Sequence, residues 1–193
     1  LHQWLLAFLT AASPCMAQIP VIPDWSADEA SHAGFFDNAA SPVAGHPSIG
    51  SLRRTIFYAA ANYVGSLFKP SYPEEFIQVR ATFSNLGPGV IGYGGPIGYM
   101  NNFGSLHPQY RPDTDYAWAL ANHIAGQTLA PGNTIDLILN SHGSIPFNYS
   151  TNNTPPPNTG VESLFVTMVH EMIHGLGFVN EINPVSGSYP GYP

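Results

Sequence analysis

The sequence is poor in cysteine and in basic residues. Cysteine occurs once, at Cys15, so the residues after it cannot form a disulfide with one another. Lysine and arginine number 5 against 12 aspartates and glutamates, giving a formal net charge of -7, and no basic cluster reverses that sign locally. A phosphate-binding surface needs positive charge, so we expect no nucleic-acid partner.

Long hydrophobic runs are also missing from the printed sequence. The apolar run from Trp4 to Ala12 is too short to span a bilayer, so we expect no transmembrane segment. Pro14 and the small residues up to Ala17 follow it, a pattern typical of a secretory signal peptide cleaved before Gln18. The start of that pattern lacks an initiator methionine and a basic segment. We therefore interpret residues 1–17 as an incomplete signal peptide and expect a secreted or extracellular protein, with the bacterial envelope as a further location.

The rest of the chain has the length and composition of one folded domain. The whole sequence has 193 residues, 44% of them hydrophobic, and 19 each of glycine and proline, which predicts a packed core with many loops. Residues 18–50 show no sustained period and are predicted to be an irregular N-terminal arm in which Asp24, Asp28, Glu29 and His32 are solvated. Residues 51–193 are predicted to form the domain.

Hydrophobic periodicity predicts an α+β domain. Helical spacing over 52–68, with Ser51 as the N-cap, predicts one helix, and "DYAWALANHIAGQTL" (115–129) predicts another, capped by Asp113 or Thr114 and ended by Pro131 and Gly132. Strict alternation in "EEFIQVRATF" (74–83) predicts a half-buried strand, and "TIDLILN" (134–140) a second strand. The glycine-rich residues 85–100 predict short strands joined by tight turns, and 141–160 a polar loop.

A further helix is predicted near the C-terminal end of the printed sequence. Thr159 and Glu162 have the spacing of a capping box, T-x-x-E, immediately before "SLFVTMVHEMIHGLGF". Apolar residues then recur at helical spacing and predict one buried face: Phe165, Val169, Ile173 and Leu176.

This helix carries the residues of a metal site. His170 and His174 are four residues apart, so they lie one turn above each other on one face and their imidazoles can converge on one ion. Glu171 is rotated by about 100 degrees around the helix axis, which keeps its carboxylate out of the ligand set but near a water on the metal. H-E-x-x-H thus predicts two ligands for Zn²⁺ and one general base.

The motif and its surroundings resemble a known family. "HEMIHGLGF" resembles the zincin signature and, with Gly177, the longer H-E-x-x-H-x-x-G-x-x-(H/D) form of the metzincins. Together with "RATFSNLGPGVIGYGGP" and "YAWALANHIAGQTLAPGNTIDLILNS", it resembles secreted bacterial zinc metalloproteases with an H-E-I-G-H-G-L-G-F motif. The resemblance implies a zincin fold, in which a twisted mixed β-sheet supports a backing helix and an active-site helix, with a cleft along the edge strand. It also implies a zinc-dependent endopeptidase acting on proteins or peptides.

The third zinc ligand departs from the metzincin pattern. Asn180, a poor ligand for zinc, stands where metzincins have His or Asp. A left-handed Gly177 could end the helix and return the chain toward the metal, which makes Glu181 the best local alternative. The remaining possibility is a ligand beyond Pro193. The terminal "SGSYPGYP" also lacks the lower subdomain of zincins, so we expect a fragment.

Three further expectations follow from this interpretation. Tyr189 and Tyr192 are candidate donors to the oxyanion of a peptide-hydrolysis intermediate. His142 lies shortly before the predicted helix and is either a cleft residue or an ordinary loop histidine. The neutral Asn180 also admits a different class of function, a non-catalytic zincin-like binding or adhesion module.

Overall fold

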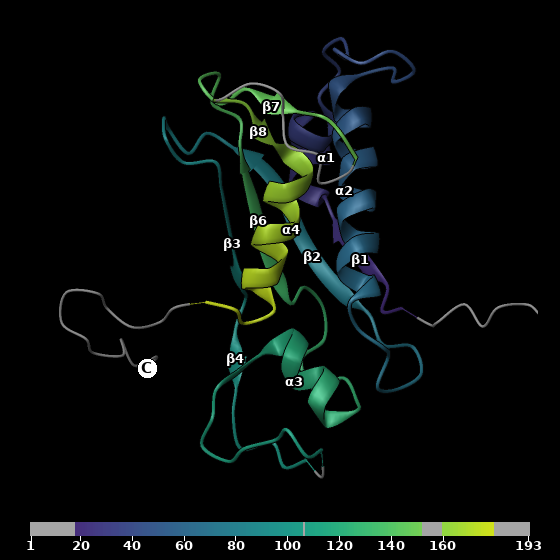
Figure 1. Cartoon of the computed structure of the whole chain (residues 1–193), viewed down its shortest axis with the longest axis vertical. Helices are drawn as coiled ribbons and strands as arrows, with labels where there is room; N and C mark the ends of the chain where they lie inside the picture. The colour runs from purple at the N-terminus through teal and green to yellow at the C-terminus, as the bar shows by residue number, and fades with distance from the viewer. Residues whose placement is uncertain (1–17, 106, 152–159, 180–193) are drawn as a thin grey trace, which may run out of the picture.

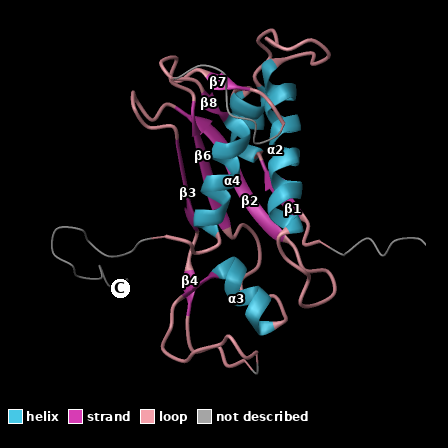
Figure 2. Ribbon diagram, in the orientation of Figure 1, coloured by secondary structure: helices cyan, strands magenta, loops and turns pink. Residues whose placement is uncertain are grey.

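The structure, a computed structural model, describes residues 18–105, 107–151 and 160–179 (Figure 1). These residues form four α-helices, a short 3₁₀ helix and a four-stranded sheet with two small strand pairs beside it (Figure 2). Predictions for residues 1–17 and for Asn180, Glu181, Tyr189 and Tyr192 lie outside the described residues. The mixed α/β architecture is compatible with the predicted α+β class.

The main sheet has the strand order β1-β2-β6-β3. Three strands run parallel: β1 (Val21–Asp24), β2 (Ile77–Ser84) and β6 (Ile135–Asn140). The fourth strand, β3 (Gly92–Pro96), pairs antiparallel with β6 and forms the edge of the sheet. The sheet is therefore mixed, and its one antiparallel strand lies at a border.

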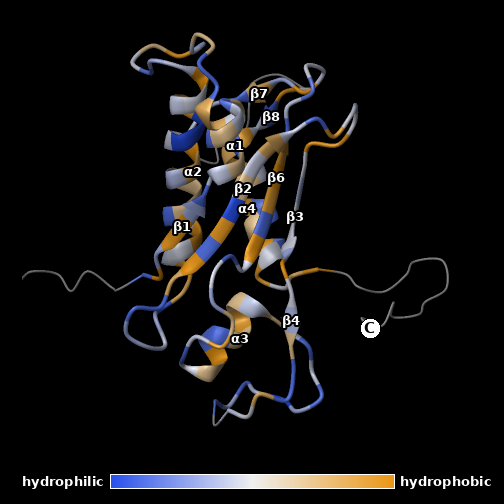
Figure 3. Cartoon of the chain, turned by 180° about the vertical axis from the view of Figure 1, so that it is seen from behind, coloured by the Kyte–Doolittle hydropathy of each residue, from blue (hydrophilic) through white to orange (hydrophobic). Residues whose placement is uncertain are grey.

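Alternation along the two central strands determines which face is buried. The odd-numbered residues of β2 from Ile77 to Phe83 are buried while their neighbours are exposed or half-buried, and Ile135, Leu137 and Leu139 of β6 are fully buried. Helices α2 (Ile49–Ser66) and α4 (Leu164–Gly175) pack on each other and against that buried face. Seen from behind, β2 and β6 stand in front of α4 (Figure 3).

The other face of the sheet is polar where the two central strands pair. Arg80 of β2 lies opposite Asp136 of β6 in the parallel register, and its Nε donates to an Asp136 carboxylate oxygen at 2.7 Å. Both predicted strands are thus confirmed, and their pattern explains the layer arrangement.

The prediction of an irregular arm over residues 18–50 is wrong. This segment contains β1, helix α1 (Ser26–Ser31) and the 3₁₀ helix η1 (Gly34–Phe36), and Phe35 is fully buried in the core. Asp28, expected in solvent, is only 2% exposed. Its carboxylate accepts from the backbone N–H groups of Phe35 at 2.8 Å and Phe83 at 3.2 Å, and from the hydroxyl of Thr82. These donors replace the solvation that Asp28 loses on burial.

A smaller group of elements lies below the sheet in Figure 1. Strand β4 (Tyr99–Met100) pairs antiparallel with β5 (Tyr116–Ala117), which leads directly into helix α3 (Trp118–Ala125). The helix is shorter than the predicted 115–129 at both ends, because the residues before Trp118 form β5 and because Gly126 adopts a left-handed conformation with φ 66° and ends the helix. The Asn122 side chain then accepts from the backbone N–H groups of Leu129 and Ala130 and holds the following loop.

The starts of α2 and α4 also differ from prediction. The N-cap of α2 is Ser48, whose hydroxyl accepts from the Ser51 N–H, so the helix begins three residues earlier than expected. The N-cap of α4 is Ser163, whose hydroxyl accepts from the Val166 N–H, while Glu162 belongs to the short strand β8 (Glu162–Ser163) that pairs with β7 (Phe147–Asn148). Within the described part of the chain, no helix has the length and hydrophobicity needed to cross a membrane.

Candidate metal site

Helix α4 is held in place by its buried face. Leu164, Met168 and Met172 are fully buried and Phe165 nearly so, so the centre of that face is displaced from the predicted stripe of Phe165, Val169, Ile173 and Leu176. Val169 and Ile173 are partly buried and pack at the margin of the core. The imidazoles of the motif occupy the neighbouring side of the helix.

Two glycines allow α4 to approach the sheet closely. A Cβ atom on Gly175 would lie 2.3 Å from a side-chain carbon of Ile135 in β6. A Cβ atom on Gly94 in β3 would lie 2.2 Å from the carbonyl oxygen of Glu171 and 2.5 Å from its Cβ. Both positions exclude a larger side chain without rearrangement, so the edge strand lies directly against the Glu171 backbone.

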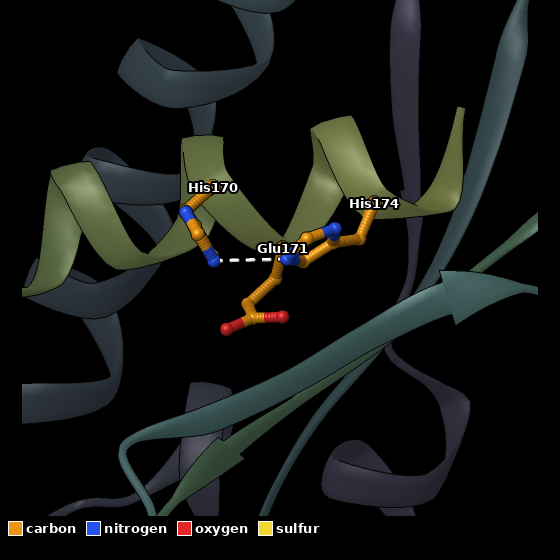
Figure 4. A group of neighbouring side chains, drawn as sticks. All are labelled: His170, Glu171 and His174. Atoms are coloured by element: carbon orange, nitrogen blue, oxygen red, sulfur yellow. Dashed lines mark hydrogen bonds between the residues drawn. The ribbon is translucent and has the colours of Figure 1, made fainter. Parts of the chain in front are cut away.

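The two histidines of the motif converge, as the spacing predicts. Their Nε2 atoms lie 2.9 Å apart, with ring centroids 4.4 Å apart and ring planes at 88° (Figure 4). His170 is exposed and His174 is half-buried. With Glu171 they form a group whose potential ligand atoms all lie within 4.8 Å of one another, and which could hold a metal ion.

The segment after α4 orients His174. Gly177, with φ 102°, reverses the chain after the helix, and its N–H donates to the carbonyl of His174. This turn places the Phe178 carbonyl oxygen 2.6 Å from His174 Nδ1. Since a carbonyl only accepts, Nδ1 carries the proton and Nε2 of the neutral imidazole presents its lone pair to a metal.

Glu171 lies in a different environment from the histidines. It is 9% exposed, against the edge strand (Figure 4). Burial raises the pKa of the Glu171 carboxyl, while the electrostatic interactions with His170 and His174 and a hydrogen bond from the Gly94 N–H partly oppose that rise. A carboxylate with a raised pKa is a stronger base than an ordinary surface glutamate.

The structure does not add His142 to this group. His142 follows β6, is half-buried, and its Nδ1 lies 2.7 Å from the Ser144 hydroxyl, as in an ordinary loop turn. His123 of α3 pairs with the buried carboxylate of Glu75, with its Nδ1 2.8 Å from a carboxylate oxygen.

Two features of the site could not be assigned from the sequence. The Phe178 carbonyl is a backbone group, and nothing in the residue type predicts its contact with His174. Gly94 left a weak signal, because consecutive glycines inside a strand indicate a close approach by another backbone. No local pattern indicates that the approaching backbone is that of Glu171.

No protein-family model matches the chain, and no curated protein or solved structure is significantly similar to it. The described residues therefore define a mixed α/β chain with a candidate metal-binding helix, and its function has to be inferred from the site.

Proposed function

We propose that the chain is a secreted zinc-dependent endopeptidase of the zincin type. The observation that carries the proposal is the convergence of the His170 and His174 Nε2 atoms beside the buried Glu171 carboxylate. Two imidazole nitrogens suit zinc, and catalytic zinc sites normally have three protein ligands. The third ligand is Glu181, Asn180 or a residue beyond Pro193.

The donor set fits a zinc ion. His174 presents a lone pair at Nε2 because the Phe178 carbonyl fixes its proton on Nδ1, the arrangement typical of metal-bound histidines. His170 Nε2 lies close enough to bind the same ion. A bound zinc supplies Lewis acidity and lowers the pKa of a coordinated water toward about 7.

Glu171 performs the proton transfers in this proposal. Its carboxylate accepts a proton from the attacking water and then donates that proton to the amine of the departing peptide. Burial favours this role, because the raised pKa of Glu171 brings the carboxyl closer to neutral pH, where both transfers must occur.

The edge strand supports a role in binding extended peptides. The carbonyl of Ile91, just before β3, accepts from the Asn140 N–H, and the N–H of Ile97, just after β3, donates to the Thr134 carbonyl. In the antiparallel register, the odd-numbered residues of β3 are therefore the ones whose backbone groups hydrogen-bond to β6. Alternation along an antiparallel strand then directs the backbone groups of Gly92 and the carbonyl of Gly94 away from β6, while the Gly94 N–H donates to Glu171. A substrate strand aligned with these groups would pass beside Glu171.

Replacing the proposed base tests the proposal. We expect Glu171→Gln to retain zinc, measured by elemental analysis, and to lose at least about 100-fold in kcat on a quenched fluorescent peptide, the lower range for removing a general base. Glu162→Gln, two residues before the helix and half-buried, is the matched control and should cleave normally. Cleavage at the wild-type rate by Glu171→Gln would remove Glu171 from the mechanism.

The alternative is a non-catalytic zincin-like module that binds or adheres to other molecules. Asn180, at the position where metzincins have a charged or imidazole ligand, favours it. Such a module needs no base at position 171, so Glu171→Gln would leave ligand binding unchanged, and the zinc-loaded wild-type chain would cleave no peptide.

A further inference from the structure

A large pocket opens where β3 continues into β4. It lies further along the chain than Gly94, the β3 residue that contacts Glu171 of the metal group (His170, Glu171 and His174). Its volume is about 710 Å³, within the range of sites that hold a ligand or a long side chain. One end of the pocket is lined by Tyr93 and Pro96, on either side of Gly94, which lies against Glu171. The other end is lined by Asn101 and Asp115.

The pocket walls are fixed by packing rather than formed by a loose loop. Trp118, the first residue of α3, lies against Gly98, where a Cβ atom would be 2.6 Å from the indole ring. Its Nε1 donates to the carbonyl oxygen of Tyr99 at 3.2 Å. The β4–β5 pairing then brings Asn101 opposite Asp115, and the Asn101 amide donates to one oxygen of that carboxylate at 2.8 Å.

The lining has the chemistry of a site for a cation. Asp115 is the one charged residue among the described residues that line the pocket, and a carboxylate that accepts a single hydrogen bond retains capacity for more. Tyr93, which is 58% exposed, and Tyr99 add aromatic rings on which a guanidinium can stack.

The strand β3 connects the pocket to the position that lies against Glu171. A strand advances by about 3.3 Å per residue, so Pro96 lies roughly 7 Å along β3 from Gly94. A peptide extended along β3 with its reacting bond beside Glu171 would reach the pocket with a side chain two to five residues away, a span estimated from the same rise per residue.

We infer that this pocket is a substrate subsite that selects an arginine or lysine side chain two to five residues from the cleaved bond. The inference rests on the proposed peptidase function and names its substrate class. Asp115 is the specificity-determining residue, and it acts by pairing with the substrate cation.

Paired peptides test the inference. Peptides carrying arginine at each position from five before to five after the cleaved bond are compared with the same peptides carrying citrulline, which keeps the shape and removes the charge. We expect kcat/KM to favour arginine by about fivefold at one position, the upper range for a partly exposed ion pair. Asp115→Asn should abolish that ratio, and a fivefold preference that survives in Asp115→Asn would overturn the assignment to Asp115.

Asp113→Asn is the matched control. Asp113 lies two residues before Asp115, does not line the pocket, and bonds to Asn102 instead. Its φ of 58° is tolerated by asparagine, so this variant should fold and keep the arginine preference.

Binding separates failure of the subsite from failure of the peptidase. The affinities of fluorescein-labelled arginine and citrulline peptides are measured with the Glu171→Gln variant, because a binding measurement does not require the chain to cleave the peptide. An arginine preference that Asp115→Asn removes supports the subsite even if the wild-type chain cleaves nothing. Equal binding and equal cleavage of the two peptides by a chain that Glu171→Gln inactivates would overturn the subsite and leave the peptidase proposal standing.

Discussion

Gly94 and Glu171 lie so close that no side chain fits between the edge strand and the helix of the metal group. The contact joins β3 to α4 at the residue proposed as the base, and a Cβ atom on Gly94 would lie 2.2 Å from the Glu171 carbonyl oxygen. The position of Glu171 relative to the edge strand is therefore determined by backbone packing.

Adding a methyl group at this contact should separate the two elements. We expect Gly94→Ala to lower the free energy of unfolding by about 1–3 kcal/mol, as overpacked cores do, and to weaken zinc binding. Gly143→Ala is the control, because a Cβ atom there meets nothing within 4 Å, and its effect should stay within about 0.5 kcal/mol. Urea unfolding of the two variants measures the difference; equal stabilities would show that the contact is not tight.

Zinc uptake should depend on both imidazoles. We expect about one zinc per wild-type chain by elemental analysis, and loss of that zinc in His170→Ala and His174→Ala, since each removes one of few ligands. His142→Ala, a loop histidine outside the group, should keep the metal. A folded wild-type chain without zinc would contradict a site completed within these residues and favour a ligand beyond Pro193 or the binding module.

The buried carboxylate of Asp28 should be a major source of stability. Asp28→Ala leaves the N–H groups of Phe35 and Phe83 without their acceptor, and an unsatisfied buried donor costs about 1–3 kcal/mol. We therefore expect a loss of about 2–5 kcal/mol in the free energy of unfolding by urea. Glu29→Ala, on the exposed side of the same helix, should change little. A similar small effect at both positions would mean that the carboxylate is not needed.

The Glu75–His123 pair should give stability a specific pH dependence. The hydrogen bond from Glu75 raises the pKa of His123 above 6.5 despite its burial, so this contribution is complete below pH 6.5 and declines as pH rises through the folded-state pKa. Burial raises the pKa of Glu75, but hydrogen bonds from His123 and Ser71 outweigh it and leave that pKa below 4.5. The Glu75 contribution is therefore complete above pH 4.5 and declines as pH falls through the folded-state value.

The pair should thus stabilise the chain most between about pH 4.5 and 6.5. Urea unfolding from pH 4 to 8.5 should show wild-type stability falling on the alkaline side of this window, and less so in His123→Gln. His46→Gln, at a histidine outside the ion pairs of the described residues, is the control. An unchanged alkaline decline in His123→Gln would assign it to other groups.

Local patterns predicted the elements that bury a regular face. Alternation in 74–83 predicted β2, and the short apolar run 134–140 predicted β6, because burial on a sheet face repeats every second residue. The four-residue spacing of His170 and His174 likewise predicted their convergence, since helix geometry alone brings them together.

The remaining features depend on partners that are distant in the sequence. β1 is four residues long and exists because β2 pairs with it, so residues 18–50 alone gave no signal for it. Asp28 is buried because donors from Phe35, Thr82 and Phe83 meet at its carboxylate. A hydropathy pattern predicts that every aspartate is exposed, because it contains no information about hydrogen-bond donors that come from distant parts of the chain.

The parallel pairing of β1, β2 and β6 also affects how fast the metal group can form. Val21 lies opposite Ile77 and Val79 opposite Ile135, so each pairing closes a loop of about 55 residues. Such closures cost entropy before any contact stabilises the sheet, and chains dominated by them fold in milliseconds to seconds. β3 attaches to β6, the last strand of this sheet along the chain, so the strand that packs against Glu171 joins late, and the site proposed for zinc is complete only after the sheet has closed.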